Sequence, residues 1–419
     1  MPKPSADMDD TKIYGLLGEK LGHSYSPQIH AHLGEYEYRL FERAEEDVPA
    51  FLASAEFEAI NVTIPYKKTV MPYLAEISPE ARKIGSVNTI TRVNGALHGD
   101  NTDYYGFSYM LAESGINVKG RKCLVLGSGG ASVTAQAVLT DLGAFPVVIS
   151  RGGENNYDNL DRHADASVIV NTTPVGMYPK NGISPIDLSL FPHLVGVVDM
   201  IYNPRRTALI LAAKDRGIPA VSGLSMLVAQ AKRANELFFS RPLPDAVMAE
   251  VIRKTRRQME NVILIGMPGC GQSTAGKRLA ERLGFAFADT DEEIVRMTGR
   301  TPAEIIKEDG EDAFRKIEHD AACELGKRSG TVIATGGGIV TRAKNRDPLR
   351  QNGTVIYLAR PLEKLATGNR PLTARDGVQA LFEKRKPLYE SWADATALCE
   401  DDTDETVQNL IAAMDAAKE

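Results

Sequence analysis

The sequence has few cysteines and no long apolar run. Its four cysteines, Cys123, Cys270, Cys323 and Cys399, are far apart and form no Cys-x-x-Cys pair, which predicts free thiols in a reducing compartment. No apolar run approaches the roughly 18 residues that a membrane span needs. The first ten residues lack the apolar core of a signal peptide. These absences predict a cytoplasmic protein that has no membrane partner.

The sequence also has no excess of positive charge, no internal repeat and no low-complexity tract. Its net charge of −6 argues against nonspecific binding to nucleic acid, which needs a basic surface. The composition, 43% hydrophobic and 25% charged, is ordinary for a globular protein. A length of 419 residues suggests two or three domains. Nothing in the sequence indicates an oligomeric state.

Short apolar runs alternate with helical patterns along most of the chain. This alternation predicts an α/β fold with parallel sheets and helices on both faces. Residues 11–111 form one such unit, and a second begins near residue 112 and extends to residue 222. Residues 223–257 are helical in pattern. A new strand at residue 261 places another domain at 258–419, with almost no flexible linker before it.

A glycine-rich loop at residues 266–274 (Gly-Met-Pro-Gly-Cys-Gly-Gln-Ser-Thr) follows the apolar run 261–265 and precedes a helical pattern. This is the strand, loop and helix context of a phosphate-binding P-loop. Gly269 and Gly271 would let backbone N–H groups wrap a phosphate. Ser273 would hold Mg²⁺, with Thr274 beside it. Gln272 stands where a lysine normally reaches the phosphates, so the loop predicts phosphoryl transfer and a reduced rate.

A second glycine-rich turn closes the strand at residues 122–126 and opens a helix. It is close to the dinucleotide fingerprint, except that the third glycine position is Ser132. A tight turn between strand and helix is the alternative interpretation. The turn residues that would contact a dinucleotide are Gly127, Gly129, Gly130 and Ala131.

The end of the following strand discriminates between the two nicotinamide cofactors. An acidic residue there would bind the ribose 2′-hydroxyl of NAD. The sequence has Ser150 and Arg151 instead, and an arginine suits the 2′-phosphate of NADP. A solvated surface arginine is the alternative interpretation.

Three polar clusters lie upstream among apolar residues: residues 23–27 (His-Ser-Tyr-Ser-Pro), 61–68 (Asn-Val-Thr-Ile-Pro-Tyr-Lys-Lys) and 99–103 (Gly-Asp-Asn-Thr-Asp). Taken singly, each has an ordinary explanation. Ser26 before a proline is typical of a helix N-cap, a lysine after a strand is usually solvated, and the third cluster is typical of a turn.

Taken together, and with residues 223–230 (Gly-Leu-Ser-Met-Leu-Val-Ala-Gln), these clusters closely resemble shikimate dehydrogenase over about residues 12–250. The resemblance implies a two-lobed fold: residues 11–111, with the helices at 223–257 returning to them, bind substrate, and residues 112–222 form a Rossmann-like NADP(H) domain. It implies that Lys67 and Asp103 flank the reacting C–O group. The implied ligands of the substrate's carboxylate and hydroxyls, and one further position near it, are Ser24, Ser26, Thr63, Asn88, Gln230 and Tyr202.

The chemistry of the resemblance fits these residue types. Reduction of 3-dehydroshikimate needs a proton at the oxygen while the cofactor supplies hydride. A lysine within hydrogen-bond reach can donate that proton, and a neighbouring aspartate modulates it. Whether Lys67 or Asp103 carries the proton stays open at this point, as does a preference for quinate over shikimate.

The C-terminal part, about residues 260–415, resembles shikimate kinase. Its motifs follow the P-loop in order: Asp-Thr-Asp at 289–291, Phe-Arg at 314–315, Gly-Gly-Gly at 336–338, Arg-Pro-Leu at 370–372 in a lid-like segment, and Arg-Lys-Pro-Leu-Tyr at 385–389. The resemblance implies ATP with Mg²⁺ near Ser273 and Asp289, and Arg370 on the ATP phosphates. The implied shikimate-binding residues are Asp291, which also lies near the attacking hydroxyl, Arg315, Gly337, Gly338 and Arg385.

The sequence therefore predicts a bifunctional enzyme that reduces 3-dehydroshikimate with NADPH and then phosphorylates the resulting shikimate with ATP. The alternative keeps the dehydrogenase and makes the second half a catalytically weak binding or regulatory module, because Gln272 replaces the P-loop lysine. Lys277 is the nearest cation in sequence. Five residues along a helix is about 140° around its axis, so Lys277 should point away from the phosphates.

Overall fold

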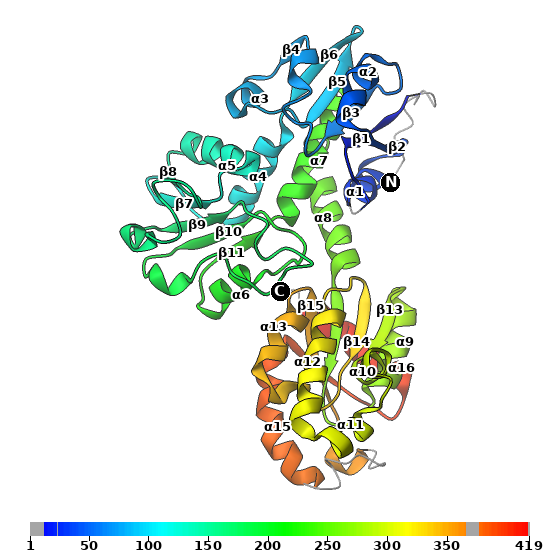
Figure 1. Ribbon diagram of the computed structural model, residues 1–419. Helices are drawn as coiled ribbons and strands as arrows, with labels where there is room; N and C mark the ends of the chain where they lie inside the picture. Colours follow the sequence, from blue (N-terminus) through cyan, green and yellow to red (C-terminus); the bar gives the residue numbers. More distant parts are fainter. Residues whose placement is uncertain (1–11, 23, 366–376, 418–419) are drawn as a thin grey trace. The chain divides into compact units, whose positions relative to one another are not determined.

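The computed structural model describes residues 12–22, 24–365 and 377–417. Its internal contacts divide the chain into two compact units. Unit 1 comprises Met1–Val175, Ser184–Tyr202 and Ala212–Arg256, and unit 2 comprises Gly176–Ile183, Asn203–Leu211 and Arg257–Glu419. Each unit is built from parallel or mixed sheets covered by helices (Figure 1).

The first sheet of unit 1 has six strands in the order β2-β1-β3-β5-β6-β4. The hairpin between β5 and β6 is antiparallel, and Asn94 and Gly95 turn it with positive φ angles of 50° and 82°, as an Asn-Gly hairpin turn requires. β1 pairs in parallel with both neighbours. The strands are Tyr14–Gly18 (β1), Tyr38–Glu42 (β2), Ala59–Val62 (β3), Glu76–Ile77 (β4), Thr89–Val93 (β5) and Ala96–Asp100 (β6).

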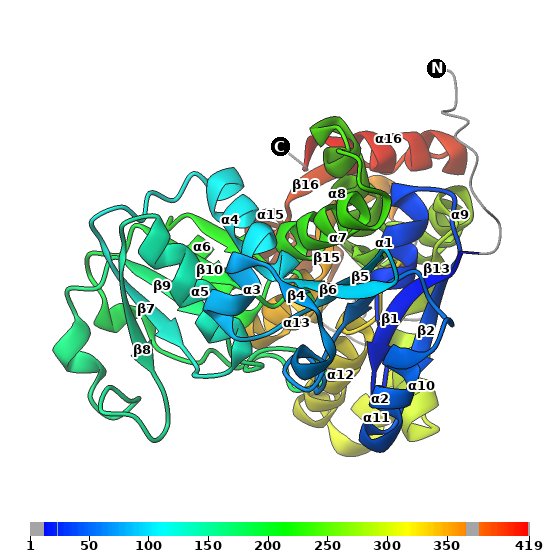
Figure 2. The ribbon, with the colours of Figure 1, turned by 90° about the horizontal axis from the view of Figure 1, so that it is seen from above.

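Helices α4 (Thr102–Ser114) and α7 (Leu224–Phe239) run side by side in unit 1 (Figure 2). They approach closely because Gly106 has no side chain: a Cβ there would lie 2.7 Å from the carbonyl oxygen of Met226. The helices that accompany this sheet are α1 (Ser26–Leu33), α2 (Val48–Ala53), α3 (Pro79–Ile84) and α8 (Asp245–Met259), the last of which crosses the boundary between the units.

The second sheet of unit 1 has five parallel strands in the order β11-β10-β9-β7-β8. β7, β9 and β10 are buried along almost their whole length, which explains their apolar, β-branched sequences. The elements are β7 (Lys122–Leu126), α5 (Gly130–Asp141), β8 (Phe145–Ile149), β9 (Val168–Asn171), β10 (Gly196–Asp199), α6 (Ala208–Asp215) and β11 (Ala220–Ser222).

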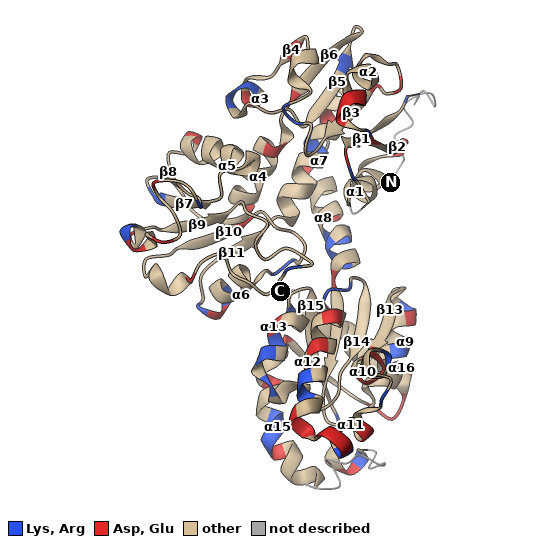
Figure 3. Cartoon of the chain, viewed as in Figure 1, with Lys and Arg blue, Asp and Glu red and all other residues tan. Residues whose placement is uncertain are grey.

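Unit 2 contains a five-stranded parallel sheet in the order β13-β14-β12-β15-β16. The strands are Asn261–Ile265 (β12), Ala286–Asp289 (β13), Thr331–Ala334 (β14), Gly353–Ala359 (β15) and Ala395–Leu398 (β16). The helices are α9 (Gln272–Leu283), α10 (Thr290–Thr298), α11 (Pro302–Asp309), α12 (Glu311–Gly326), α13 (Arg346–Arg350), α15 (Val378–Trp392) and α16 (Thr403–Ala416). Figure 3 shows both signs of charge interspersed along α12 and α15.

Two short segments, 176–183 and 203–211, belong to unit 2 although their neighbours in the chain belong to unit 1. The half-buried Arg206 donates from its backbone N–H to the carbonyl of Gln351 at 3.0 Å and from Nη2 to the carbonyl of Gly353 at 2.5 Å. The hydroxyl of Tyr178 donates to the carbonyl of Gly326 at 2.8 Å. Burial lowers the pKa of Arg206 to about 10. These segments complete the packing at the amino-terminal end of β15.

The structure confirms the predicted α/β class with parallel sheets. The domain boundaries drawn from the sequence stay a prediction. Among the described residues, no helix is both long enough and apolar enough to cross a membrane.

Candidate active sites

Lys67 and Asp103 form an ion pair in unit 1, with Lys67 Nζ 2.5 Å from Asp103 Oδ2. Lys67 lies in the turn after β3, and Asp103 lies in the first turn of α4. Asn101 sets this helix start, because its side-chain oxygen accepts from the Asp103 N–H at 3.1 Å. The side chains are 28% and 21% exposed, so the pair is accessible to a small substrate.

Lys67 and the adjacent Lys68 lie in a turn and not in a strand, because residues 64–70 form turns. Tyr66, which is buried, donates its hydroxyl to the carbonyl of Arg43 at 2.6 Å and anchors the turn. With the turn held in this way, Lys67 is half-buried against Asp103 and Lys68 is exposed.

Asn88, Thr102 and Gln230 form a polar network beside this pair. The Asn88 side-chain oxygen accepts from the Thr102 N–H at 2.7 Å. The Thr102 hydroxyl lies 3.2 Å from that oxygen and 3.4 Å from Oε1 of Gln230, which projects from α7. Asn88 is buried, at 3% exposed. A chain of satisfied buried polar groups fixes the orientation of its members, so Asn88 and Gln230 are held in place.

The serines of the first cluster do not cap a helix. α1 begins at Ser26 with Tyr25 as its N-cap residue and no side-chain cap, so the N-cap interpretation of Ser26 is wrong. Ser24 Oγ accepts from the Ser26 N–H at 3.2 Å. Tyr25 packs edge-to-face against Tyr202, with ring centroids 5.8 Å apart, and burial raises the pKa of Tyr202. Thr63 follows β3 and is partly exposed.

The dinucleotide fingerprint lies where β7 ends and α5 begins. Gly127 has φ of +103°, and a Cβ there would lie 2.9 Å from Thr173, so only glycine fits. Gly129 is the N-cap residue of α5. Gly129 and Gly130 face open space and Ala131 is exposed, so the backbone N–H groups at this helix start are accessible to a phosphate.

Ser150 and Arg151 follow β8, the strand next to β7. Ser150 is held by a hydrogen bond from its N–H to the carbonyl of Asn155 at 3.1 Å. Arg151 is exposed. The carboxyl ends of neighbouring parallel strands meet at one edge of a sheet, so Arg151 and the glycine loop lie at the same edge.

The P-loop of unit 2 follows β12, the central strand of its sheet. Gly269 and Gly271 have φ of +85° and +103°, conformations that favour glycine. Ser273 and Thr274 are exposed in the first turn of α9. Ser273 Oγ donates to Asp289 Oδ2 at 2.7 Å. A hydroxyl and a carboxylate at this distance provide the oxygen ligands that Mg²⁺ prefers.

Gln272 is turned away from the position of a phosphate. Its side-chain N–H₂ donates to the carbonyls of Gly266 and Thr335, both at 3.2 Å, and the residue is 6% exposed. A hydrogen bond from this amide to a phosphate would require the side chain to leave these two carbonyls. Lys277 lies 3.7 Å from Glu292 and over the ring of Phe287, as the helical spacing predicts.

Two buried arginines meet the glycine loop at 336–338. A Cβ on Gly338 would lie 2.4 Å from the guanidinium of Arg315, and Arg385 Nη1 donates to the carbonyl of Gly337 at 3.2 Å. Both arginines are 4% exposed. Within the described part of the chain, Arg385 Nε is buried without a partner. An unpaired donor on a buried cation favours an anionic ligand here.

Glu318, which the sequence analysis missed, accepts from Arg315 Nη1 with both carboxylate oxygens, at 2.9 and 2.8 Å. Burial raises the pKa of Glu318 although the charge of Arg315 opposes the shift. Its spacing of three residues from Arg315 on α12 was the available signal. Thr290, also missed, accepts from the Gly336 N–H at 2.8 Å. Asp291 follows it and lies 3.4 Å from a Cβ placed on Gly336.

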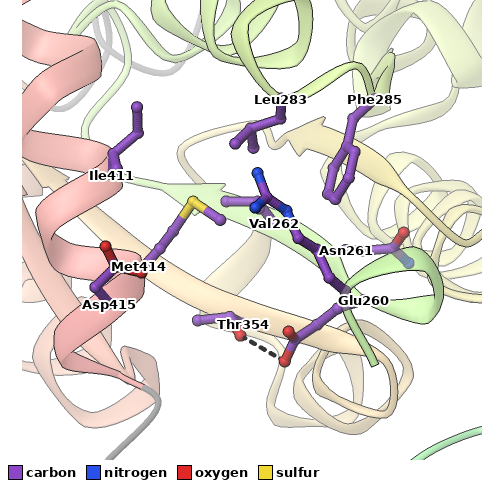
Figure 4. A pocket seen from close by; sticks show the side chains of 10 residues that line it. Glu260, Asn261, Val262, Leu283, Phe285, Thr354, Ile411, Met414 and Asp415 are labelled. Carbon is purple, nitrogen blue, oxygen red and sulfur yellow. Dashed lines mark hydrogen bonds between the residues drawn. The ribbon is translucent and has the colours of Figure 1, made fainter. Parts of the chain in front are cut away.

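These contacts bring Ser273, Asp289 and Asp291 together with the arginines at one end of the unit 2 sheet. Arg370 lies outside the described residues. A cavity of about 120 Å³ lies at the other end of the strands, where Leu283, Phe285 and Met414 line it (Figure 4). It is lined by the first residue of β12 and the second of β15, so it is separate from the P-loop.

Comparison with known proteins assigns both units. A family model described as "Shikimate dehydrogenase substrate binding domain" matches residues 16–90. The NADP(+)-type shikimate dehydrogenase of Clostridium beijerinckii is 38% identical over 247 residues, which cover 54% of this chain and 92% of that protein. The chain belongs to the shikimate dehydrogenase family. The corresponding protein of Thermosynechococcus vestitus is 34% identical over 281 residues, covering 60% of this chain and 97% of the relative.

Solved shikimate dehydrogenase structures resemble the same part of the chain. A chorismate mutase/shikimate 5-dehydrogenase fusion protein from Clostridium acetobutylicum is 40% identical, with a TM-score of 0.56, and the match covers 58% of this chain and 97% of that one. The enzyme from Thermus thermophilus, solved in complex with NADP(H) and shikimate, is 32% identical with a TM-score of 0.53, and covers 58% of this chain and 99% of that one.

The C-terminal part of this shikimate dehydrogenase family member is similar to shikimate kinases. The family model described as "Shikimate kinase" matches residues 268–415. The match covers the arginines and glycines described above, and the P-loop from Pro268 onward, Gln272 included. The roles of the individual site residues in both units stay predictions.

Proposed function

We propose that the chain catalyses two consecutive reactions: reduction of 3-dehydroshikimate to shikimate with NADPH in unit 1, and phosphorylation of shikimate with MgATP in unit 2. The Lys67–Asp103 ion pair carries the first assignment. The buried Arg315 and Arg385 beside the 336–338 loop carry the second. Because the product of one reaction is the substrate of the other, the two assignments support each other.

In unit 1 the residues present fit an NADP(H) molecule, since the N–H groups after Gly129 are accessible and Arg151 is exposed at the same sheet edge. When bound, the nicotinamide supplies the hydride that reduces the C3 carbonyl. Lys67 donates a proton from its ammonium to the carbonyl oxygen as the hydroxyl forms. Asp103 holds that ammonium in position and keeps its charge balanced.

In unit 2 the carboxylate of shikimate binds the guanidinium of Arg385, whose Nε has no partner among the described residues. Arg315 lies beside it, held by Glu318. Asp291 accepts the proton of the attacking hydroxyl as the new O–P bond forms and the bond to ADP breaks. Ser273 and Asp289 fit a Mg²⁺ ion that would neutralise phosphate charge.

The test of this proposal follows NADPH loss and ADP release separately with the purified full chain. We expect NADPH loss on adding 3-dehydroshikimate, with NADPH preferred to NADH, and ADP release on adding shikimate and MgATP. Quinate in place of shikimate should support NADP⁺ reduction less well. Failure of either reaction would remove that half of the proposal and leave the other half standing.

A second candidate function for unit 2 is a binding module of low catalytic rate. The buried amide of Gln272, bonded to two backbone carbonyls, favours it, because a fixed cation at a transferring phosphoryl group contributes about 10²–10⁵ in rate. Gln272→Lys discriminates between the candidates. We expect kcat for ADP release to rise at least about tenfold at saturating shikimate and MgATP. An unaltered protein that already turns over at roughly 1–100 s⁻¹, with no gain from the lysine, would reject the weak module.

A further inference from the structure

The P-loop lacks a cation of its own in the first turns of α9. Gln272 is neutral and turned toward carbonyl groups, and Lys277 is 58% exposed and directed at Glu292. The proposed kinase reaction nevertheless requires the polyphosphate of ATP, with several negative charges, to bind at this loop. The helix N-terminus contributes only about half a positive charge. Another fixed cation beside the loop would therefore have a large effect on nucleotide affinity.

Arg360 is such a cation, although no sequence motif indicated it. It directly follows β15, and β15 pairs in parallel with β12, whose end leads into the P-loop. Arg360 Nη1 would lie 3.8 Å from a Cβ placed on Gly271. Gly271 is the N-cap residue of α9, so the guanidinium lies beside the N-terminus of this helix.

The guanidinium of Arg360 is held by two hydrogen bonds, but not all of its N–H donors have partners among the described residues. Nη2 donates to Asp401 Oδ1 at 2.9 Å, and Nη1 donates to the sulfur of Cys399 at 3.5 Å. The side chain is only 19% exposed, and Nε is buried without a partner in the described part of the chain. Arginine has five N–H donors, so donors remain for a further anion. Asp401 is 67% exposed, which leaves its charge screened by solvent and the cation incompletely neutralised.

We infer that Arg360 binds the phosphate chain of the nucleotide and supplies the fixed positive charge that Gln272 does not. The inference rests on the proposed kinase function of unit 2 and adds a nucleotide-binding residue to it. Arg360 is placed by the end of a buried strand, so its position is set before the nucleotide arrives. A planar guanidinium with unused N–H donors is suited to phosphate oxygens.

The test measures nucleotide affinity directly, by calorimetric titration of the full chain with MgATP, MgADP and adenosine. Arg360→Ala should weaken the binding of both nucleotides about 10- to 100-fold, the range for losing hydrogen bonds from a charged group. Adenosine affinity should stay within about twofold. An equal loss for adenosine would place the arginine on the base and overturn the inference, as would unchanged MgATP affinity.

Lys364→Ala is the matched control. Lys364 Nζ donates to the same Asp401 at 2.7 Å, but its side chain is 44% exposed. Unlike Arg360, Lys364 does not lie within 4 Å of a Cβ placed on Gly271. This variant should bind MgATP within about twofold of the unaltered chain. If it loses as much affinity as Arg360→Ala, the arginine acts only by holding Asp401, and the inference fails. Fluorescence of Trp392 during urea unfolding verifies that unit 2 of each variant is folded.

A rescue experiment separates charge from shape. In the double variant Gln272→Lys/Arg360→Ala, the lysine should recover at least about tenfold of the lost MgATP affinity, because either cation can meet the phosphates. If MgATP affinity does not recover, a cation at position 272 cannot replace the one at position 360, and the inference fails. If the unaltered chain binds MgATP yet releases no ADP with shikimate, the proposed kinase reaction fails while these affinities still decide the role of Arg360.

Discussion

Two adjacent lysines show how much a single contact matters at the residue scale. Lys67 meets Asp103, and Lys68 is exposed. Lys67→Ala should lower kcat for 3-dehydroshikimate reduction by about 10²–10⁴, the usual range for a positioned proton donor, with KM for the substrate changed much less. Lys68→Ala is the control and should leave kcat within about twofold. A greater loss of kcat in Lys68→Ala would show that Lys68, and not Lys67, acts in the reaction.

The residue scale also predicts a pH effect from His30 in α1. Its side chain is 1% exposed and stacks on Tyr38, and its Nδ1 shares a hydrogen bond of 2.5 Å with the Tyr36 hydroxyl. Burial lowers the pKa of His30 to about 3 from its ordinary 6.5. Because the pKa of His30 is lower in the folded chain, the unfolded chain binds this proton at a higher pH than the folded chain does. The stability from neutral His30 is therefore complete above pH 6.5 and is lost as pH falls from there toward 3.

For His30 we expect a loss of about 2 kcal/mol of unfolding free energy between pH 7 and pH 5. The measurement is urea unfolding of unit 1, followed by dehydrogenase activity after each pH and urea treatment. His30→Gln removes the titrating group, so its stability should change less over the same interval. His32→Gln is the control, because His32 is only partly buried and should preserve most of the acid sensitivity. An identical pH dependence for His30→Gln and the unaltered chain would contradict the prediction.

Several site residues could be placed from the sequence, and others could not. The resemblance to shikimate kinase implied that Ser273 and Asp289 lie near one Mg²⁺ ion, and the structure has the two side chains hydrogen-bonded. The side-chain direction of Gln272 was not predictable, because it depends on a carbonyl of Thr335 far away in sequence. Arg360 was missed for the same reason: only strand pairing places it beside Gly271. Long-range pairing of this kind leaves no local pattern.

At the scale of elements, the contact between α4 and α7 depends on Gly106. Gly106→Ala would gain up to about 1 kcal/mol of helix propensity. The new Cβ would lie 2.7 Å from the Met226 carbonyl, and overpacking costs typically about 1–3 kcal/mol, so we expect a net loss of stability. Because α4 also carries Asp103, dehydrogenase kcat should fall as well.

The measurements for Gly106→Ala are the temperature at which dehydrogenase activity is lost and kcat at room temperature. Gly152→Ala is the matched control, because a Cβ there meets nothing within 4 Å and φ is not positive. A variant Gly106→Ala that is as stable and as active as the Gly152 control would show that the helices separate at no cost.

Elements were easier to predict than the contacts between them. The alternation of apolar runs and helical patterns indicated the parallel sheets correctly, since buried strands need β-branched sequences. The segment 61–68 was interpreted as a strand that ends in a turn, and the structure has strand to Val62 and turns from residue 64. The path of the turn depends on the Tyr66 hydroxyl bonding to Arg43, a tertiary contact that no local pattern indicates.

At the scale of the whole molecule, unit 2 depends on the segment 203–211. Arg206→Ala removes a donor to the Gly353 carbonyl, and hydrogen bonds from charged groups contribute about 1.5–3 kcal/mol. Although partial burial of the cation is itself unfavourable, the alanine removes this bond and the packing of the long side chain, so we expect unit 2 to lose about that amount of stability.

Trp392 is the single tryptophan of the chain and lies in unit 2, so its fluorescence during urea unfolding reports on that unit. The control for Arg206→Ala is Arg342→Ala, which breaks an exposed ion pair with Asp312 and should cost at most about 1 kcal/mol. Equal urea midpoints for the two variants would mean that the segment contributes nothing to unit 2.

The inclusion of residues 176–183 and 203–211 in unit 2 also bears on how such a chain can be inherited or engineered. A recombination breakpoint between codons 256 and 257 would transfer the glycine loop and its helices but leave both segments in the other gene. The transplanted product would present Gln351 and Asn352, which are almost fully buried here, to water. Residues 257–419 alone therefore do not make up the whole of unit 2, and a transfer that keeps unit 2 intact has to include the upstream coding sequence for both segments.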